Sequence, residues 1–411
     1  MAQNEVIIVG AGLLGSSVAW HLAEKGCRDV VVIDPDLEGL WSSSELNAGG
    51  VRATMNHPLN IQLSIASIEF LDQHREDVGY RPVGYLWLRS KNDATALTIA
   101  REATKRQRDL GWPVEEWTVA ELCKRVPFLD KTDDLAEAHF ASRDGLVNPN
   151  RLKQFFREGA RAKGVRFLDR RRLRSAEFSA KGWSIVCDVL PASVGSDQLR
   201  SLLVDGAIGT PALRETLHGR TIVNCAGAWA GETAAILGYE THTKPQRRQI
   251  CVFDSRDVDL SPYGMIVDTS GVYFHPEGGQ GLAGFANRDE PFGKNFEYNG
   301  AQFFEECIWA PLYERSSGFE RLKHVTGWAG LYEVTPDHSA VLGAVEHSKA
   351  GKNARLFEAH GFSGHGAMQC PAAGRAIAEA VTGGRYETLD VTALSGKRFL
   401  TGALVHESFV I

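Results

Sequence analysis

The beginning of the chain carries a complete dinucleotide-binding fingerprint, which limits the possible folds more than any other part of the sequence. An apolar run at residues 6–9 is followed by Gly10, Gly12 and Gly15, and Asp34 comes 19 positions after the last of these glycines. The run predicts a central parallel strand buried on both faces. Gly10 permits a tight turn, Gly12 lets the backbone approach a pyrophosphate, and Gly15 lets the next helix pack close to the strand.

The residues after the glycines complete a strand–helix–strand unit. Leu14 stands in the first helical turn, Val18 and Leu22 continue an apolar stripe, and residues 30–33 form the predicted second strand. The start of such a helix presents free N–H groups and a positive dipole end to phosphates, and Asp34 accepts hydrogen bonds from a ribose. Because all these parts agree, the segment predicts a bound adenine dinucleotide rather than an incidental glycine turn.

The length of the chain indicates its domain organisation, and its charge argues against a nucleic-acid-binding protein. The 411 residues exceed the usual size of one core, so we expect one composite unit or two domains. With a net charge of −6, no strongly basic face argues for nucleic acid as a partner. One dense basic run is expected to be a solvated stretch after a strand, and it consists of Arg170, Arg171, Arg172 and Arg174.

The cysteine pattern and the start of the chain indicate a compartment. The seven cysteines are scattered and contain no CxxC pair, which argues against a disulfide framework or a zinc site. The first predicted strand starts at residue 6 without the regions of a signal peptide, and no apolar stretch approaches the length of a membrane span. We therefore expect a soluble cytoplasmic protein with no transmembrane segment and no nucleic-acid partner.

Two later segments are rich in small residues. A stretch at residues 192–209, rich in Ser, Gly and Asp, is expected to be a surface excursion. The next predicted strand ends at Cys225, Ala226, Gly227 and Trp229, which either approach a ligand at the carboxyl edge of the sheet or form a simple strand-to-helix turn.

A glycine-rich segment precedes a helix predicted over about residues 372–382. Its members are Gly361, Phe362, Ser363, Gly364, His365, Gly366, Ala367 and Met368. A flexible backbone followed by the positive end of a helix dipole is suited to lie against negative charge. His365 is either chemically active or a buried histidine that only makes hydrogen bonds.

Six segments in this order resemble the D-amino-acid oxidase/sarcosine oxidase superfamily of FAD enzymes. They are the fingerprint with Asp34, and residues 47–52, 144–149, 223–229, 330–337 and 361–366. The resemblance implies an α/β fold, α+β overall, with a Rossmann-like FAD-binding domain and a discontinuous substrate domain built on an antiparallel sheet. It assigns the FAD-binding domain to residues 1–80, 145–235 and 324–411, and the substrate domain to residues 81–144 and 236–323.

The activity implied by this resemblance is hydride transfer from the carbon next to an amine nitrogen to flavin N5. The protein supplies orientation and electrostatics, and the helix after residues 361–366 would stabilise negative charge on the reduced flavin. We expect an FAD-dependent oxidoreductase that acts on a secondary or N-substituted amino acid. Oxidation of a 2-hydroxy acid on the same scaffold is the alternative enzyme activity.

The resemblance also assigns substrate roles to individual side chains. Arg52 matches the arginine that binds the substrate carboxylate in sarcosine oxidases, and the alternative is a surface ion pair. Tyr273 and Tyr332 match tyrosines of the substrate cavity, and the alternative is two core aromatics. Tyr332 stands where D-amino-acid and glycine oxidases carry a carboxylate-binding arginine, which disfavours D-amino acids and glycine as substrates. Met368 stands where monomeric sarcosine oxidase has a lysine, which disfavours plain sarcosine.

The flavin is implied to contact a loop and a strand as well as the glycine-rich segments. These residues are Asn47, Ala48, Gly49, Gly50, Val51 and Gly330. Asn47 and Gly330 stand where relatives attach flavin covalently through histidine or cysteine, so we expect non-covalent FAD. Sarcosine-type oxidases place a lysine over the flavin from the strand at residues 278–284, which lacks one here, so we expect slow reaction with oxygen and another, unidentified electron acceptor.

Three further segments resemble one branch of the family more narrowly. They are residues 60–64, 268–274 and 373–379, and that branch is linked to the assembly of mitochondrial respiratory complex I. This resemblance leaves open a third function, a flavin-binding assembly or interaction protein in which catalysis is dispensable.

Overall fold

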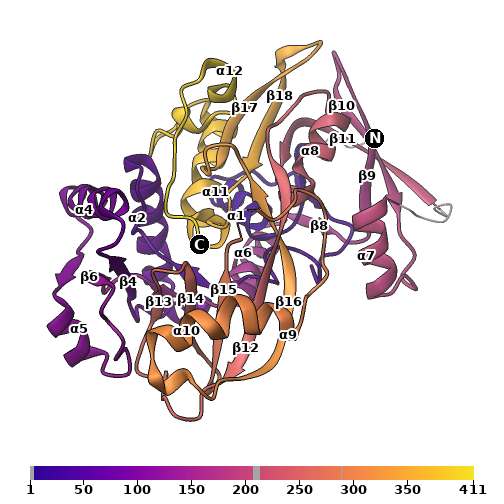
Figure 1. The fold of residues 1–411 in the computed structure, drawn as a ribbon. Coiled ribbons are helices and arrows are strands. Elements are labelled where there is room, and N and C mark those ends of the chain that lie inside the picture. The colour runs from indigo at the N-terminus through magenta and orange to yellow at the C-terminus, as the bar shows by residue number, and fades with distance from the viewer. Residues whose placement is uncertain (1–3, 207–212, 288) are drawn as a thin grey trace.

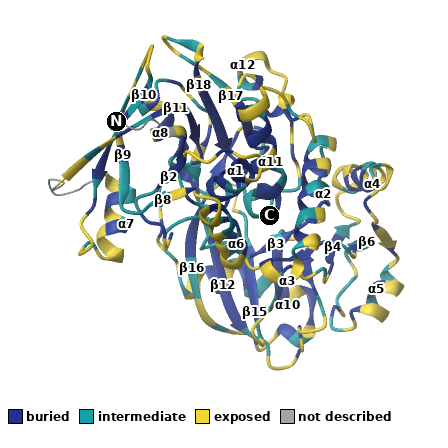
Figure 2. Ribbon diagram, turned by 180° about the vertical axis from the view of Figure 1, so that it is seen from behind, coloured by how far each residue is buried: buried dark blue, intermediate teal, exposed yellow. Residues whose placement is uncertain are grey.

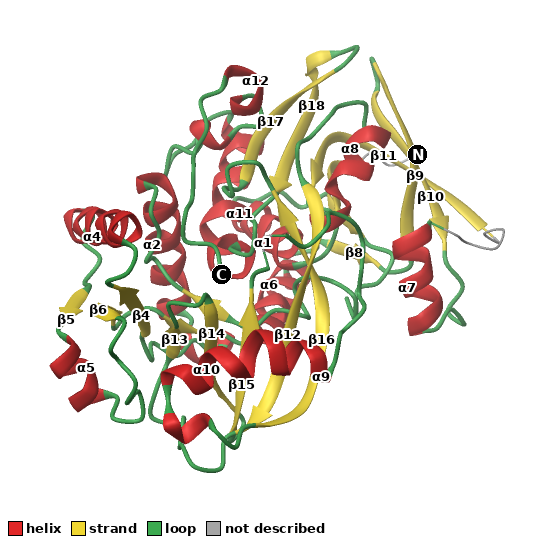
Figure 3. Ribbon diagram, viewed as in Figure 1, coloured by secondary structure: helices red, strands yellow, loops and turns green. Residues whose placement is uncertain are grey.

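Two large sheets form the frame of the molecule (Figure 1). The structure is a computed structural model that describes residues 4–206, 213–287 and 289–411. A short ribbon of β3 (Gly50–Val51) and β7 (Gly145–Leu146) accompanies the two eight-stranded sheets. Figure 3 shows helices gathered beside the first sheet and across the second.

The first sheet contains the predicted fingerprint strand in its interior. The order of its strands is β17 (Val341–His347), β18 (Gly351–His360), β11 (Leu213–Asn224), β1 (Asn4–Val9), β2 (Val30–Ile33) and β8 (Arg166–Leu168). The first half of β11 also pairs with β10 (Gly182–Val189), which in turn pairs with β9 (Arg171–Ser179). β1 pairs in parallel with both neighbours, so strands far apart in the sequence lie side by side. Alternation along β1 places Val6 and Ile8 in one core and Ile7 in the core on the opposite face. The prediction of a strand buried on both faces is confirmed.

Helices cover one face of this sheet. They are α1 (Leu13–Glu24), α2 (Pro58–Gln73), α6 (Pro149–Ala162) and α11 (Gly366–Gly383). Asn148 caps α6 and Pro149 occupies its first turn, which are the positions these two residue types favour. A Cβ on Gly374 of α11 would lie 2.2 Å from the Ser17 hydroxyl, so this glycine lets α11 pack closely against α1. Figure 2 shows α1 and α11 inside the molecule and α4 (Ala94–Asp109), α5 (Val119–Arg125) and α12 (Arg398–Thr401) largely exposed.

Two helices differ from the sequence-based prediction. The expected surface excursion contains α7 (Ser196–Asp205), whose Leu199 and Leu202 are buried against Leu190, while residues 207–209 lie outside the described residues. The Ser, Gly and Asp content obscured this short apolar stripe, although Gly206 ends α7 in the left-handed conformation that glycine favours. α11 begins at Gly366 rather than near residue 372, so the glycine-rich segment leads directly into its first turn.

The second sheet is largely antiparallel and forms the opposite wall of the site. Its order is β16 (Lys323–Val334), β12 (Lys244–Asp254), β15 (Gln280–Phe285), β14 (Val272–Glu277), β13 (Met265–Val267), β4 (Tyr85–Ser90), β6 (Leu135–Ala141) and β5 (Glu115–Trp117). One face packs against α10 (Ala310–Arg315) and the short helical turns before it, through Phe303, Ile308 and Leu312. β16 begins at Lys323, so this sheet crosses the predicted boundary at residue 324.

The architecture confirms the predicted fold class. A Rossmann-like parallel sheet with helices and a separate antiparallel sheet are both present. The smaller helices are α3 (Arg75–Val78) and α8 (Ala230–Ile236), the latter contributing Ala234 to the core on the second face of the parallel sheet. Among the described helices, none combines the length and apolar character needed to cross a membrane.

Candidate active site

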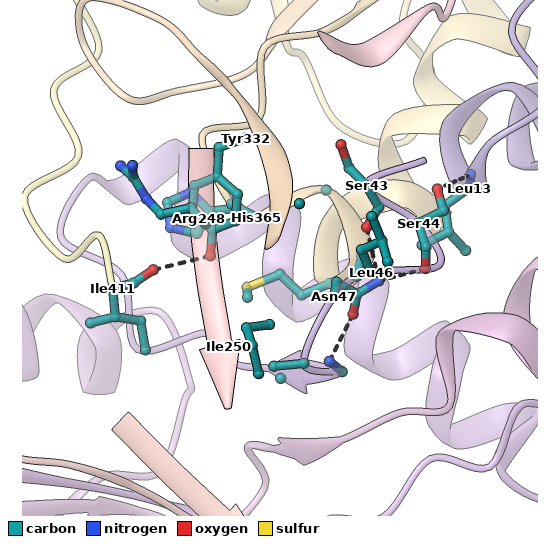
Figure 4. Close-up of a pocket in the computed structure, with 18 of the residues that line it drawn as sticks. Leu13, Ser43, Ser44, Leu46, Asn47, Arg248, Ile250, Tyr332, His365 and Ile411 are labelled. Atoms are coloured by element: carbon teal, nitrogen blue, oxygen red, sulfur yellow. Dashed lines mark hydrogen bonds between the residues drawn. The ribbon is translucent and has the colours of Figure 1, made fainter. Parts of the chain in front are cut away.

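Two adjoining cavities lie between the sheets. The first is bounded by the second sheet, the loop before β3 and the start of α11, and the second follows the carboxyl edge of the parallel sheet. They share the wall residues Leu13, Leu14, Ser43, Ser44 and Glu333. Figure 4 shows the first cavity, with Tyr332, Arg248, His365 and Ile411 at one side and Ser43, Ser44 and Leu13 at the other.

The glycine fingerprint lines the second cavity. Gly10 has a φ of +100°, and a Cβ there would lie 2.4 Å from the Cys225 carbonyl oxygen, so only glycine fits this turn. A Cβ on Gly12 would meet only the Ser44 hydroxyl, at 3.0 Å. The backbone of Gly12 is therefore open towards the cavity.

Asp34 lines the second cavity and also fixes the turn. Its carboxylate accepts hydrogen bonds from the backbone N–H groups of Ala11 at 2.6 Å and Asp36 at 2.8 Å. Burial raises the pKa of Asp34 to about 6. This position is consistent with the prediction that the Asp34 carboxylate borders the dinucleotide site. The sequence did not predict the two hydrogen bonds that the carboxylate accepts from the backbone.

Most of the other predicted cofactor residues line one of the two cavities. The second cavity contains Cys225, Ala226, Gly227 and Trp229, and the first contains Asn47, Ala48, Gly49, Gly50, Gly330, Gly364, His365, Gly366, Ala367 and Met368. Five predicted residues lie behind these walls: Gly15, Val51, Gly361, Phe362 and Ser363. Gly15 acts through packing, since a Cβ there would lie 1.9 Å from the Gly10 carbonyl oxygen.

Part of the basic run after β8 lines the second cavity. Arg171 and Arg172 line the second cavity, and Arg171 Nε lies 2.9 Å from a Glu215 carboxylate oxygen. The expectation of a purely solvated stretch is therefore wrong for these two residues. The Arg171 N–H donates to the Asp34 carbonyl at 2.9 Å, so the start of β9 lies at the cavity through a long-range contact that local composition does not reveal.

The loop before β3 is held by its own polar side chains. Ser44 Oγ accepts a hydrogen bond from the Leu13 N–H at 2.9 Å, which joins the loop to the first turn of α1. The Asn47 side chain donates to the Ser44 carbonyl at 2.8 Å and accepts from the Gly49 N–H at 2.7 Å. These bonds fix the Asn47 side chain within the loop and leave the backbone of residues 47–50 to form the cavity wall.

Arg52 is buried at the inner end of the first cavity and is 1 % exposed. Its Nη2 donates to the Phe409 carbonyl and lies 3.3 Å from His365 Nε2, and its guanidinium stacks 5.0 Å from the centre of the Trp87 ring. No ion pair to Arg52 is found among the described residues. The alternative interpretation of a surface ion pair is therefore wrong.

His365 precedes the first turn of α11 and faces Arg52. Burial, reinforced by the Arg52 charge, lowers the pKa of His365 well below its usual value. The imidazole is therefore neutral near pH 7. A neutral Nε2 accepts the hydrogen bond that Arg52 Nη2 donates, so His365 positions the guanidinium.

The two predicted tyrosines lie on the cavity side of the second sheet. Tyr273 is opposite Gly284 on β15, where a Cβ would lie 2.2 Å from the tyrosine oxygen. Tyr332 donates a hydrogen bond from its hydroxyl to the Ile411 carbonyl at 3.1 Å. Both tyrosines therefore line a cavity, and the alternative of two plain core aromatics does not describe their positions.

Arg248 is a cavity residue that the sequence did not reveal. It lies on β12 opposite Gly330, and its guanidinium stacks 5.0 Å from the centre of the Tyr332 ring. Its Nε is buried and unpartnered in the described structure, and burial lowers its pKa. The signal that could have found it is alternation along β12, which places Arg248 and Ile250 on the cavity face and Cys251 in the core beyond.

The last described residues complete the cavity. The Glu407 carboxylate accepts hydrogen bonds from the backbone N–H groups of Asn56 and His57 and from the Asn60 side chain, which ties the segment to the start of α2. Beyond this anchor, Phe409 contacts Arg52 through its carbonyl and Trp87 through its ring. Ile411 lines the cavity itself.

The comparisons with known proteins agree with this arrangement. The sequence model of the family described as "FAD dependent oxidoreductase" (DAO) matches residues 5–380. The chain belongs to this family. The protein named "FAD-dependent oxidoreductase domain-containing protein 1" from Xenopus laevis is 31% identical over 428 residues, covering 97% of this chain and 83% of the relative.

Solved structures share the DAO fold. L-proline dehydrogenase from P. horikoshii superposes with a TM-score of 0.81 at 22% identity and covers 98% of this chain and 99% of its own. Iminodiacetate oxidase from Chelativorans sp. BNC1 superposes with a TM-score of 0.72 at 22% identity and covers 95% of this chain and 98% of its own. At these identities the likeness establishes the fold alone.

The cavities fit the FAD on which the DAO family depends. The second cavity offers the open backbone of Gly12 and the start of α1, which suit a pyrophosphate. Glu333 Oε2 is buried at the wall between the cavities without a hydrogen-bond partner in the described structure, and hydroxyl groups of FAD would supply one. The chain is an FAD-dependent oxidoreductase of the DAO family. Glu333 is a wall residue of both cavities that the sequence reasoning did not single out.

Proposed function

We propose that this chain oxidises a secondary or N-substituted amino acid, with FAD held non-covalently. The observation that carries the proposal is a buried, positively charged Arg52 beside Tyr332 in a cavity that adjoins the fingerprint cavity. An amino-acid carboxylate is the partner that an arginine fork suits best. The DAO-fold relatives named for proline and iminodiacetate support a secondary amine as the substrate class.

Arg52 orients the substrate by its carboxylate. The carboxylate would replace the Phe409 carbonyl on Nη2 or use Nε, which has no partner among the described residues. His365 stays neutral and accepts from Arg52, so it holds the guanidinium without competing for the anion. The hydroxyls of Tyr273 and Tyr332 border the remaining space, where they would hold the amine.

The start of α11 supplies the electrostatics. Gly366 and Ala367 line the cavity at the positive end of a helix of 18 residues. Bound FAD supplies the hydride acceptor at N5, and the helix end would stabilise the negative charge that results. The substrate loses a hydride from carbon and a proton from nitrogen to become an imine, and water converts the imine to a carbonyl compound and an amine.

An acceptor other than oxygen regenerates oxidised FAD in this proposal. β15 holds no lysine, and no lysine is found among the described residues that line the first cavity. A lysine charge over the flavin would favour the superoxide formed in the first electron transfer to oxygen. We therefore favour a dehydrogenase, with a quinone, an electron-transfer flavoprotein or a dye as the acceptor.

The test is anaerobic mixing of the holoenzyme with a panel of amines and 2-hydroxy acids while the flavin absorbance is followed. The proposal predicts bleaching by secondary amino acids. Bleaching by 2-hydroxy acids alone would make the chain a hydroxy-acid dehydrogenase. A flavin that no member of the panel bleaches would favour the assembly or interaction protein.

A further inference from the structure

Two guanidinium groups border the same cavity from different parts of the fold. Arg52 follows β3 and Arg248 lies on β12 of the second sheet. Tyr332 lines the same cavity as both arginines. Its ring stacks on the Arg248 guanidinium, and its hydroxyl donates a hydrogen bond to the Ile411 carbonyl. Figure 4 places Arg248 and Tyr332 together at the side of the cavity where Ile411 lies.

Neither guanidinium has a carboxylate partner in the described structure. The hydrogen-bond acceptors of Arg52 are the carbonyls of Thr54 and Phe409, the Met55 sulfur and the neutral His365 ring. Those of Arg248 are the Arg247 carbonyl and the Gln246 side-chain oxygen. Both arginines also keep a buried Nε without a partner.

The neighbouring arginine on β12 provides a contrast. Arg247 points to the opposite face of the strand, where its Nε lies 2.7 Å from a Glu290 carboxylate oxygen. The protein therefore pairs the outward-facing arginine and leaves the cavity-facing one unpaired. A largely buried charge without an oppositely charged partner is costly, so the arrangement is complementary to an anionic ligand.

One amino-acid carboxylate would satisfy one of the two guanidiniums. We propose that the substrate carries a second carboxylate, bound by Arg248, so that the amine nitrogen lies between two carboxyl-bearing arms. This inference rests on the proposed oxidation of a secondary amino acid and narrows its substrate class to N-(carboxyalkyl) amino acids. Arg248 is then the residue that determines specificity for the second arm.

Binding is tested first, with ligands that cannot be oxidised as amines. Oxydiacetate carries two carboxylates and methoxyacetate carries one, and each is titrated into oxidised holoenzyme while flavin absorbance and melting temperature are recorded. We expect oxydiacetate to bind at least about tenfold more tightly than methoxyacetate, because a hydrogen-bonded charge pair adds that much affinity. Arg248→Met abolishes this preference, Arg248→Lys keeps part of it, and Arg247→Met leaves it intact.

Oxidation is tested second, by anaerobic flavin bleaching with iminodiacetate and N-methylglycine. We expect iminodiacetate to give the higher kcat/KM in the wild type and to lose that advantage in Arg248→Met. Oxydiacetate preference without bleaching by either amine would support the dianion site and contradict the proposed oxidation. Equal binding of both ligands, binding of neither, or a preference unchanged in Arg248→Met and Arg248→Lys would overturn the inference.

Discussion

At the scale of single residues, Arg52 carries the proposed recognition of substrate. Removing a charged partner from a desolvated carboxylate costs about 2–4 kcal/mol of binding. We therefore expect Arg52→Met to raise KM for carboxylate-bearing amines while the FAD content, measured by absorbance, stays the same. Equal turnover of amines with and without a carboxylate by the wild-type enzyme would count against this role.

The sequence revealed Arg52, Tyr273 and Tyr332 because each stands in a segment that resembles family motifs. Arg248 stands in no such segment. Its place in the cavity follows from the register that sets it opposite Gly330, a contact across 82 positions of the chain. The carbonyl of Phe409 on Arg52 is likewise a long-range contact, which no local spacing predicts.

At the scale of elements, the packing of α1 makes stability depend on pH through His21. This residue is buried beside Trp20, Phe70 and Phe156, and burial lowers its pKa to about 3. Between pH 6.5 and about 3 the unfolded chain binds a proton that the folded chain does not, so folding stability falls as the pH drops below 6.5. His21 would contribute a loss of about 2 kcal/mol at pH 5.

The measurement is the free energy of unfolding of the wild type and of His21→Gln from pH 7.5 to pH 5. We expect the wild type to lose more stability than the variant over this range. The difference between the two proteins removes the opposite contribution of Asp34, whose pKa is raised. Parallel curves for the two proteins would show that His21 does not titrate as described.

Some helices can be predicted from the sequence, and others cannot. α1 follows from its apolar periodicity, and α6 from its Asn148 cap and Pro149, which are local signals. α7 has only a short apolar stripe, and its packing against Trp41 and Leu190 depends on the tertiary fold. The first turn of α11 was missed because glycines lower helix propensity, although Gly366 borders the cavity.

At the scale of the whole molecule, the joined cavities predict a cofactor that can be released. Gly330 has no side chain to attach to flavin, and the Asn47 side chain is engaged within its loop. Acid precipitation should therefore leave yellow FAD in the supernatant and a colourless pellet. A yellow pellet would mean that another residue forms a covalent link.

The absence of lysine among the described residues of the first cavity predicts slow reoxidation by oxygen. Photoreduced enzyme mixed with air-saturated buffer should recover its flavin absorbance slowly and recover it faster when a quinone is added. Recovery within a fraction of a second in air alone would identify an ordinary oxidase.

The proposed activity of the whole molecule is hydride transfer from the carbon next to an amine nitrogen to FAD. The most direct measurement is anaerobic stopped-flow reduction of the flavin by the best amino-acid substrate, with hydrogen or deuterium on that carbon. We expect the amino acid to bleach the flavin and deuterium to slow the bleaching. A flavin that amino acids leave oxidised, while a 2-hydroxy acid bleaches it with the same isotope sensitivity, would contradict amino-acid oxidation by this chain.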